Sequence, residues 1–545
     1  MDRVGWLGEV LTHLADGTVP VAAADCAAAW DADRDPVVAA LAAVCGFWQG
    51  DFAGATRWAV LASASADDDE TRALAFAAES LAAAGDVAAL PEPAWSDAWA
   101  LLDAAPEPDS AWWTAIRYLL AEAALVGARL ADAQRVVASG SLPGTAWSGH
   151  SFAAMMVACA VRTAVFSGNI DQATALIEPM RAATEPGTRL EGVVEAVAGL
   201  VLGNADDAGG VSRSRELTPI VHEGERDFVD RGVLLLLAFG AIAIGDVPTA
   251  ARLVFQAGDD GDLGACTIID RALGLELLVV AALAEEDLPA AETWLASLMT
   301  LADHPTSAPT VDRVRSRYLL VVGDVAAAVT AATTSIEVCR AQGRGVEAAE
   351  GEIVLARARI AGNDVAGASR DLRALVNATD ANGHRAVRRS AASTLQPARR
   401  RLPPVAGGGW DALSEREREI ARCVLEGLEV DQMAAALFLS PATVRTHVSR
   451  VLCAFAVPTR IGLLAAVGEG RVAPSTVPTP LSPRQAEVAR LVATGATNQQ
   501  VADDLGISVK GVEKHVGDIL ERWNAGSRFE VARIWWGSGA VHRGG

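Results

Sequence analysis

The chain has 545 residues and a formal net charge of −22, and 51% of its residues are hydrophobic although only 5% are aromatic. This length exceeds what one hydrophobic core holds and predicts several domains or a repeat array. The scarcity of aromatic residues beside abundant alanine and leucine favours an all-α fold over sheets, and the negative charge argues against nucleic acid as a partner of the chain as a whole.

The sequence lacks the usual marks of export and of membrane insertion. Its longest apolar stretch, residues 232–245, is too short to span a bilayer. The N-terminal segment carries acidic residues where a signal peptide would need a basic start and an apolar block. Seven cysteines are scattered without a CxxC pair, which indicates buried small side chains in a reducing compartment rather than disulfides or a zinc site. We therefore expect a cytoplasmic protein without a membrane partner.

One short pattern recurs through the first 380 residues. A glycine followed by aspartate or asparagine lies five residues before an alanine, and both flanks have helical periodicity. Glycine can end one helix in the left-handed conformation, the acidic or amide side chain caps the next helix, and alanine lets the two helices pack closely. The spacing of 33 to 42 residues is typical of two-helix repeats. Clear copies begin at Gly50, Gly168, Gly203, Gly245 and Gly323, and looser copies at Gly17, Gly85, Gly127, Glu286 and Gly362.

This array resembles tetratricopeptide-like repeats, and the resemblance implies a helical solenoid over residues 1–400. Such a solenoid is expected to act as a sensor or interaction domain for a peptide, a protein or a small-molecule effector. Its tryptophans leave two interpretations open, an aromatic ligand groove on the concave face or packing between helices, of which we favour packing. They are Trp6, Trp30, Trp48, Trp58, Trp95, Trp99, Trp112, Trp113 and Trp147.

The charge of the chain is distributed unevenly. Residues 1–380 carry a net charge of −28, whereas residues 381–545 carry +6. Six arginines and no acidic residue lie between residues 385 and 401. An acidic body joined to a basic tail indicates that the tail contacts nucleic acid, which reverses the inference from the total charge.

Two linkers rich in proline and glycine, at residues 403–409 and 468–480, delimit two segments of similar sequence. The segments cover residues 410–467 and 479–537 and align without a gap at an offset of 68 residues. An ungapped match of this length indicates a duplicated domain. Matching pairs include Leu413 with Leu481, Arg416 with Arg484, Gly427 with Gly495, Val444 with Val512, His447 with His515, and Arg460 with Arg528.

Each copy is predicted to fold into four short helices. The first helix begins at a capping box, formed by Ser414 and Glu417 in the first copy and by Ser482 and Gln485 in the second. In the third helix, valines spaced by three and four residues form a stripe that faces inward. The opposite face is basic and rich in hydroxyl groups, and such a helix can lie in the major groove of DNA. In the first copy the outward residues are Arg445, Thr446, Ser449 and Arg450.

Both copies resemble the helix-turn-helix domain of the LuxR/GerE family. The first contains Leu413-Ser-Glu-Arg-Glu417 and Ser440-Pro-Ala-Thr-Val-Arg-Thr-His447, and the second contains Gly495-Ala-Thr-Asn-Gln-Gln-Val-Ala502 and Leu505-Gly-Ile-Ser508. The resemblance implies two four-helix DNA-binding domains, each with a fourth helix that often pairs domains into dimers. The DNA-binding residues that it implies are Thr443, Arg445, Thr446, Ser449 and Arg450 in the first copy and Asn498, Lys510 and Lys514 in the second.

The two copies depart from the family pattern in different places. The first has Phe438 where the turn often holds glycine, and it keeps a basic recognition helix. The second has Gly506 in that turn, but Glu513 occupies the usual basic position of its recognition helix. Because glutamate near phosphates lowers affinity, we expect the first copy to carry more of the base recognition.

No pattern of catalytic residues accompanies these domains. Large LuxR-family regulators combine an ATPase with a solenoid and one DNA-binding domain, whereas this chain has lysine only at positions 510 and 514. A phosphate-binding loop of the GxxxxGK type therefore cannot occur before them. Neither a metal-binding set nor a nucleophile motif is present in the sequence, and we expect no enzyme activity, no cofactor and no metal.

The sequence therefore predicts a transcriptional regulator that binds double-stranded DNA at the nucleoid. The family resemblance implies an activator that contacts RNA polymerase and that forms a homodimer, unless the duplication supplies the pairing within one chain. A protein-interaction scaffold whose helix-turn-helix copies no longer bind DNA is the alternative. The support for this alternative is the charge of residues 410–545, whose 15 basic and 15 acidic residues give no net charge.

Overall fold

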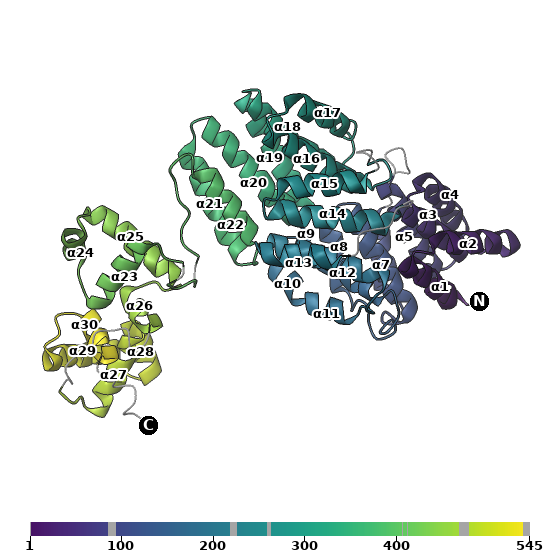
Figure 1. The fold of residues 1–545 in the computed structure, drawn as a ribbon. Coiled ribbons are helices and arrows are strands. Elements are labelled where there is room, and N and C mark those ends of the chain that lie inside the picture. Colours follow the sequence, from purple (N-terminus) through teal and green to yellow (C-terminus); the bar gives the residue numbers. More distant parts are fainter. Residues whose placement is uncertain are drawn as a thin grey trace. The chain divides into compact units, whose positions relative to one another are not determined.

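The computed structural model describes residues 2–85, 94–218, 226–258, 263–405, 407–410, 412–467 and 479–537. Every regular element within these ranges is a helix, which confirms the predicted all-α fold. The chain divides into two compact units, Met1–Leu402 and Pro403–Gly545. Figure 1 draws both, and each unit is described by itself.

The first unit is a stack of antiparallel helices in which neighbours along the chain pack side by side (Figure 1). This arrangement is the predicted helical solenoid. Its first helices are α1 (Arg3–Asp16), α2 (Val19–Asp33), α3 (Pro36–Gln49), α4 (Phe52–Ser65), α5 (Asp69–Gly85), α6 (Trp95–Asp103), α7 (Ala111–Val126), α8 (Leu130–Ala138), α9 (Ala153–Phe166), α10 (Ile170–Ala175) and α11 (Ile177–Ala182). The others are α12 (Arg189–Asn204), α13 (Ala208–Leu217), α14 (Phe228–Ala243), α15 (Val247–Ala257), α16 (Ile268–Ala284), α17 (Leu288–Met299), α18 (Ala308–Val321), α19 (Val325–Ala341), α20 (Gly345–Ala361), α21 (Val365–Asp380) and α22 (Arg385–Leu395).

Several turns within the helix pairs follow the mechanism that the repeat predicted, although at Gly127 and Gly362 the left-handed residue is the next one, Ala128 or Asn363. Gly245 has a φ of +86° and Gly323 one of +88°, so each ends its helix in the left-handed conformation. The aspartate that follows then caps the next helix, as Asp246 does by accepting a hydrogen bond from the Thr249 amide at 3.2 Å. The alanine five residues after the turn is almost completely buried between the helices, as at Ala55, Ala173, Ala250 and Ala328.

The prediction of a turn at Gly203 and Asn204 is wrong. Both residues lie inside α12, and the left-handed residue is Asp206, with a φ of +63°. Val211, five residues after Asp206, takes the buried position that was assigned to Ala208, which is exposed. Gly203 serves packing instead, because a Cβ there would lie 2.5 Å from the carbonyl oxygen of Gly240 on α14. The requirement is therefore a left-handed residue before a capping aspartate, and glycine is one way to meet it.

The tryptophans of the N-terminal part pack between helices, as we favoured. Trp48 and Trp113 are among the largest fully buried side chains, and Trp48 stacks edge-on against Phe228 with ring centroids 5.3 Å apart. Trp30, Trp95, Trp112 and Trp147 are also buried, and Trp6, Trp58 and Trp99 are partly buried against the same core.

The solenoid bends far enough for distant helices to touch. Helix α20 contacts α9, and α22 contacts α12. The amide of Ala131 donates a hydrogen bond to the carbonyl oxygen of Gln342 at 3.2 Å, and the amide of Asp171 donates one to Asn382 at 3.0 Å. One superhelical turn is therefore closed on itself within this unit, and the helices of that turn surround an interior space.

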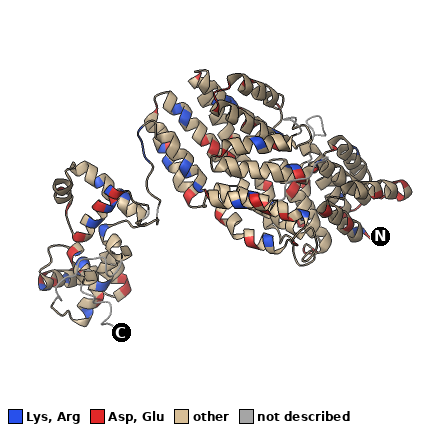
Figure 2. Cartoon of the chain, in the orientation of Figure 1, with Lys and Arg blue, Asp and Glu red and all other residues tan. Residues whose placement is uncertain are grey.

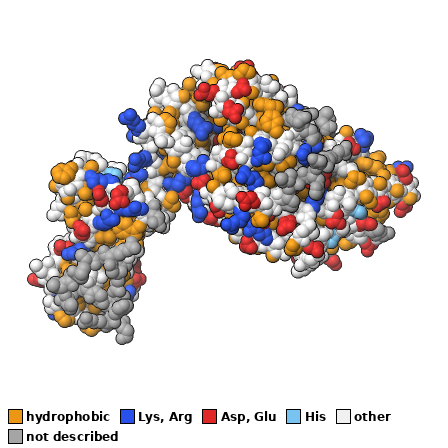
Figure 3. Space-filling view, in the orientation of Figure 1, with side chains coloured by type: hydrophobic (Ala, Val, Ile, Leu, Met, Phe, Trp, Pro, Cys, Tyr) orange, Lys and Arg blue, Asp and Glu red, His pale blue; other side chains and the backbone are white. Residues whose placement is uncertain are grey.

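Charged side chains are spread over the helices of both units (Figure 2). On the face in view in Figure 3, basic and acidic side chains of the solenoid alternate with hydrophobic ones. Within the described ranges, no helix is long and apolar enough to cross a membrane. All seven cysteines are free thiols, and five of them are buried.

The second unit contains two sets of four helices. In the first copy the helices are α23 (Glu415–Glu426), α24 (Val430–Leu437), α25 (Pro441–Ala454) and α26 (Arg460–Val467). In the second copy they are α27 (Pro483–Ala493), α28 (Asn498–Leu505), α29 (Val509–Trp523) and α30 (Arg528–Gly537).

Candidate nucleic-acid interface

The predicted capping boxes set where the helices of each copy begin. Ser414 accepts a hydrogen bond from the Glu417 amide, and the Glu417 side chain accepts one from the Ser414 amide at 2.9 Å. Ser482 and Gln485 form the same reciprocal pair at the start of α27. Because each box satisfies two otherwise unpaired amides, both copies start their first helix at the predicted residue.

Each copy presents its third helix, α25 or α29, as a half-exposed recognition helix. Val444 is completely buried beneath α25, as Val512 is beneath α29. In the first copy Arg445, Thr446 and Ser449 are exposed, as the spacing predicted. These side chains offer one guanidinium group and two hydroxyl groups, the donors and acceptors that read base edges and phosphates.

Two threonines of α25 also make local contacts. The Thr446 hydroxyl donates to the Ala442 carbonyl oxygen at 3.1 Å, and its hydroxyl oxygen keeps its acceptor capacity. The Thr443 and Ser440 hydroxyls lie 2.8 Å apart at the start of the helix. Thr443 is therefore part of the N-terminal cap, next to a helix N-terminus that favours phosphate.

The prediction that Arg450 points outward from α25 is wrong. Its Nε lies 2.7 Å from Oε1 of Glu417 on α23, and its side chain is only 26% exposed. Burial alone would raise the pKa of Glu417, but hydrogen bonds from Ser414 and the charges of Arg450 and His447 hold that pKa below its ordinary value. Arg450 therefore ties α25 to α23. Helical spacing could not reveal this, because a long side chain reaches sideways to an adjacent helix.

Of the three residues predicted in the second copy, two are exposed on α29 and the third contacts another helix. Lys510 and Lys514 are exposed on α29, where Glu513 is exposed between them. Asn498 lies at the start of α28, and its Oδ1 accepts a hydrogen bond from Nη1 of Arg528 at 2.5 Å. The structure thus places the two lysines on the recognition face and gives Asn498 a role in holding α30.

The matching histidines, His447 and His515, are placed alike in the two copies, although only His447 lies near a carboxylate, with its Nδ1 3.9 Å from Oε1 of Glu417. Each lies on its recognition helix with a buried Nδ1 that has no hydrogen-bond partner within the described residues. Both rings are half-buried. They pack against the helices beneath them, and no cluster of metal-binding side chains surrounds them in the described part of the chain.

The two copies contact each other through their fourth helices, α26 and α30. The guanidinium group of Arg460 on α26 lies over the ring of Phe529 on α30, with 4.8 Å between the Cζ atom and the ring centroid. Trp536 of α30 donates a hydrogen bond to the Ala493 carbonyl oxygen at 2.9 Å, within its own copy. Ala532 and Phe529 of the second copy pack into the hydrophobic core of the first.

The contact between the copies is reciprocal. A Cβ added at Gly427 would lie 3.6 Å from Arg533 on α30, and one added at Gly495 would lie 3.7 Å from Gly462 on α26. Gly427 and Gly495 are matching positions, so each copy packs the end of its first helix against the fourth helix of the other. This is the pattern of an isologous dimer, formed here within one chain. The glycines were visible in the sequence only as helix ends, because their packing depends on the second copy.

Comparison with known proteins assigns these two segments. Residues 411–464 and 479–535 match the family described as bacterial regulatory proteins, luxR family. A provisionally named HTH-type transcriptional regulator of Mycobacterium tuberculosis is 41% identical over 56 residues, which is 10% of this chain and 6% of that protein. The two-component response regulator PprB of Pseudomonas aeruginosa is 40% identical over 84 residues, 14% of this chain and 30% of that protein.

A third relative is the tetrathionate response regulatory protein TtrR of Salmonella typhimurium, 40% identical over 53 residues, 10% of this chain and 26% of that protein. The chain thus spans less than a third of the length of these relatives. Among solved structures, a chain of the APC/C hetero-tetramer Cut9–Hcn1 has a TM-score of 0.26 and 12% identity, with 73% of this chain and 93% of that chain covered. The second unit therefore carries two LuxR-family helix-turn-helix domains, and the similarity includes the turn and recognition helix of both.

Proposed function

We propose that this protein is a transcriptional regulator that binds double-stranded DNA through its second unit. The observation that carries the proposal is the exposed face of α25, on which Arg445, Thr446 and Ser449 stand together on a LuxR-family scaffold. A helix with such a face, supported from beneath by buried valines, has the shape and the hydrogen-bonding groups for the major groove.

We propose further that one chain reads a paired site. The contact between α26 and α30 joins the copies as a dimer contact would join two chains. Paired recognition helices call for paired half-sites in the DNA. We expect the two halves to differ in sequence, because the exposed residues of α25 and α29 differ. Activation of transcription and a contact with RNA polymerase are proposed on the family resemblance alone.

The test is selection of binding sites from a random-sequence DNA pool with the full-length chain, followed by sequencing. We expect an enriched motif that the double variant Arg445→Ala, Thr446→Ala no longer selects. The control is Arg422→Ala, which removes an exposed arginine from α23, away from the recognition face, and should select the same motif. Binding should also fall steeply between about 50 and 200 mM salt, because phosphate contacts release counterions.

Three outcomes separate the proposals. A motif with two unlike halves supports reading by both copies, and a single half-site contradicts that part alone. No enrichment at low salt contradicts DNA binding altogether. That result would favour the scaffold alternative, for which the cancelling charges of residues 410–545 are the supporting observation.

A further inference from the structure

The closed turn of the solenoid encloses a cavity of about 390 Å³. This volume falls within the roughly 300–1,000 Å³ of pockets that bind small molecules. Helices α9, α12, α14 and α16 form one side of the cavity, and α18, α20 and α22 contribute to the other. Apart from Asn204 and Glu276, the first side is apolar and is lined by Phe166, Leu200, Phe239, Ile242, Leu277 and Val280.

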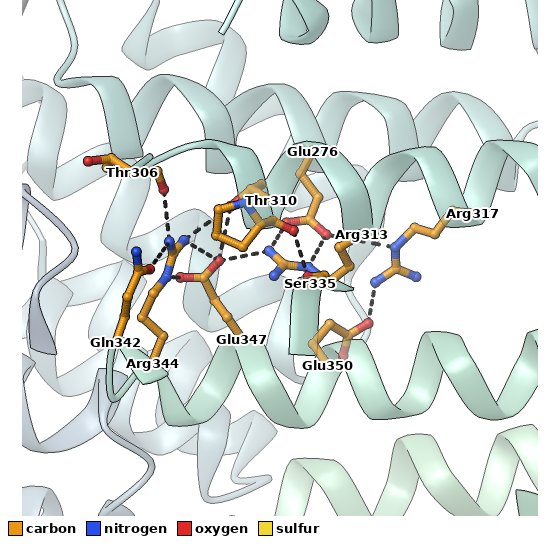
Figure 4. Close-up of polar contacts among 11 residues, drawn as sticks. Glu276, Thr306, Thr310, Arg313, Arg317, Ser335, Gln342, Arg344, Glu347 and Glu350 are labelled. Carbon is orange, nitrogen blue, oxygen red and sulfur yellow. Dashed lines mark hydrogen bonds and ion pairs between the residues drawn. The ribbon is translucent and has the colours of Figure 1, made fainter. Parts of the chain in front are cut away.

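A chain of ion pairs joins α16, α18 and α20 beside the cavity (Figure 4). Arg313 on α18 is fully buried, and its guanidinium nitrogens lie 2.8 and 2.5 Å from the Glu276 carboxylate and 3.0 Å from Glu347. Arg317, also on α18, forms an ion pair with Glu350 on α20. Arg344 binds Glu347 at 2.6 and 2.7 Å. In this network three arginines balance three glutamates.

The pKa values in this network agree with that balance. Burial alone would raise the pKa of Glu347, but the charges of Arg344 and Arg313 lower it to about 2, so the carboxylate stays ionised. His384, another lining residue, has its pKa lowered to about 4, chiefly by burial, and adds no charge at neutral pH. At the edge of the cavity, Arg389 pairs with Asp206 at 2.7 Å.

One arginine of the cavity lacks such a balance. Arg357 on α20 lines the cavity and is accessible to solvent from it. Its guanidinium group makes one long hydrogen bond, 3.4 Å to the Thr394 hydroxyl, and the described residues place no carboxylate within ion-pair distance. Burial and repulsion from Arg317 lower the pKa of Arg357, and the more distant charge of Glu350 offsets only part of that shift. A guanidinium group that is accessible from the cavity and has no ion-pair partner among the described residues can bind an anion there.

We propose that this cavity is a binding site for a small amphipathic carboxylate. The carboxylate accepts hydrogen bonds from Arg357, and the apolar body of the molecule lies against Phe166, Phe239 and Leu277. The excess of one positive charge selects a ligand with one negative group. The inference concerns the solenoid alone, so it can fail or succeed independently of DNA binding by the second unit.

The test uses two fluorescent probes that differ in charge, 1-anilinonaphthalene-8-sulfonate and its neutral analogue N-phenyl-1-naphthylamine, with the full-length chain. The sulfonate stands in for the carboxylate. Arg357→Gln should weaken binding of the anionic probe about tenfold, the loss expected for one charge-assisted contact, and should change binding of the neutral probe less than about twofold. Arg359→Gln, on the same helix but outside the cavity lining, should bind both probes as the unaltered chain does.

Two further measurements locate the probe and identify its head group. Val280→Trp fills the cavity and should abolish binding of both probes while the circular dichroism spectrum stays unchanged. Octanoate should displace the anionic probe, whereas octanol should do so far less. If Arg357→Gln does not fold, Arg357→Lys serves in its place and should retain part of the affinity, because it keeps the charge and loses the planar contact.

Several results would overturn the proposal. Equal binding of the two probes, or an anionic probe insensitive to Arg357→Gln, would show that the charge selects no ligand. Undiminished binding in Val280→Trp would place the probe elsewhere on the protein. Failure of octanoate to compete at millimolar concentration would exclude the carboxylate class.

Discussion

The two helix-turn-helix copies share a scaffold and differ on their recognition faces. Arg416 donates a hydrogen bond to the Leu437 carbonyl oxygen at 2.5 Å, and the matching Arg484 donates one to Leu505 at 2.6 Å. Arg460 and its match Arg528 likewise bind carbonyl oxygens at matching positions in front of the second helix. The contacts that close the four helices are therefore duplicated in detail.

The exposed positions of the recognition helices have changed. Arg445 of the first copy is aligned with Glu513 of the second, and Ser449 is aligned with Gly517. A substitution at an exposed position usually changes stability by less than about 0.5 kcal/mol, so the fold tolerates it. The same substitution should change DNA affinity much more, because replacing arginine by glutamate reverses the sign of a charge near phosphate. The comparison teaches that equal scaffolds do not indicate equal DNA binding.

The largest expected effect comes from exchanging the two unlike charges. Arg445→Glu should lower the affinity of the full-length chain for its selected site by roughly 10–100-fold, the 1–3 kcal/mol of one specific arginine contact or more. Glu513→Arg should raise the affinity by about tenfold. Fluorescence anisotropy at fixed salt measures both.

The control for this exchange is Arg422→Glu, which makes the same change of charge on the exposed surface of α23. It should alter affinity less than about threefold, since only the general electrostatic attraction changes. A larger loss from altering Lys514 than from altering Arg445 would mean that the second copy dominates, contrary to our expectation.

A smaller effect is expected in the stability of the first helix of each copy. Glu417→Ala removes a capping partner and leaves Arg450 half-buried without its carboxylate, at a cost of about 2 kcal/mol. Gln485→Ala removes the matching cap and a hydrogen bond from Arg522, at a cost of about 1 kcal/mol. Hydrogen exchange of the amides in α23 and α27 compares the two copies within one protein. Equal losses would show that the ion pair adds nothing to the cap.

Lowering the pH should destabilise the first helix of the first copy more than that of the second copy. The folded pKa of Glu417 lies below its ordinary value of 4.5, so its carboxylate contributes stability that is present above pH 4.5 and is lost as pH falls through the folded pKa. Gln485 does not titrate. Protection of α23 should therefore decline below about pH 4.5 faster than protection of α27, and Glu417→Gln should remove that difference.

The smallest effect concerns the turn before the recognition helix. Phe438 has a φ of +54° and is 95% exposed, whereas the matching Gly506 has a φ of +62°. Phe438→Gly should stabilise the first copy by about 1 kcal/mol, because glycine adopts this conformation without steric cost. Gly506→Phe should destabilise the second copy by a similar amount. Urea unfolding measures both, and a loss of stability in Phe438→Gly would show that the ring makes a contact of its own.

Local sequence signals predicted most of the helices and much of the candidate interface. The capping boxes at Ser414 and Ser482 and the buried stripe of α25 depend on neighbours a few residues away, so the spacing of residues was sufficient. The same reasoning failed for the direction of Arg450, and it could not reveal the contact of Asn498 with Arg528, because both partners lie on other helices. It also misplaced the turn at Gly203, because Asp206 adopts the left-handed conformation that was expected of glycine.

The cavity of the solenoid could not be predicted at all. Its two sides are brought together by contacts such as that between Asp171 and Asn382, which lie more than 200 residues apart. The bend that joins them is the sum of small rotations from many repeats, and no single residue specifies it. Arg357 is therefore one arginine among many in the sequence, and only the closed turn reveals that it lines a cavity.

The reciprocal packing of α26 and α30 has a consequence for how binding depends on the amount of protein. Two separate chains must first meet, so at low concentration a dimeric regulator loses its paired form. Copies joined by a linker of about a dozen residues meet at an effective concentration on the order of millimolar, whatever their abundance. Occupancy of a paired site should then rise with the first power of concentration, and a cell that holds only a few copies would still have every one of them ready to bind.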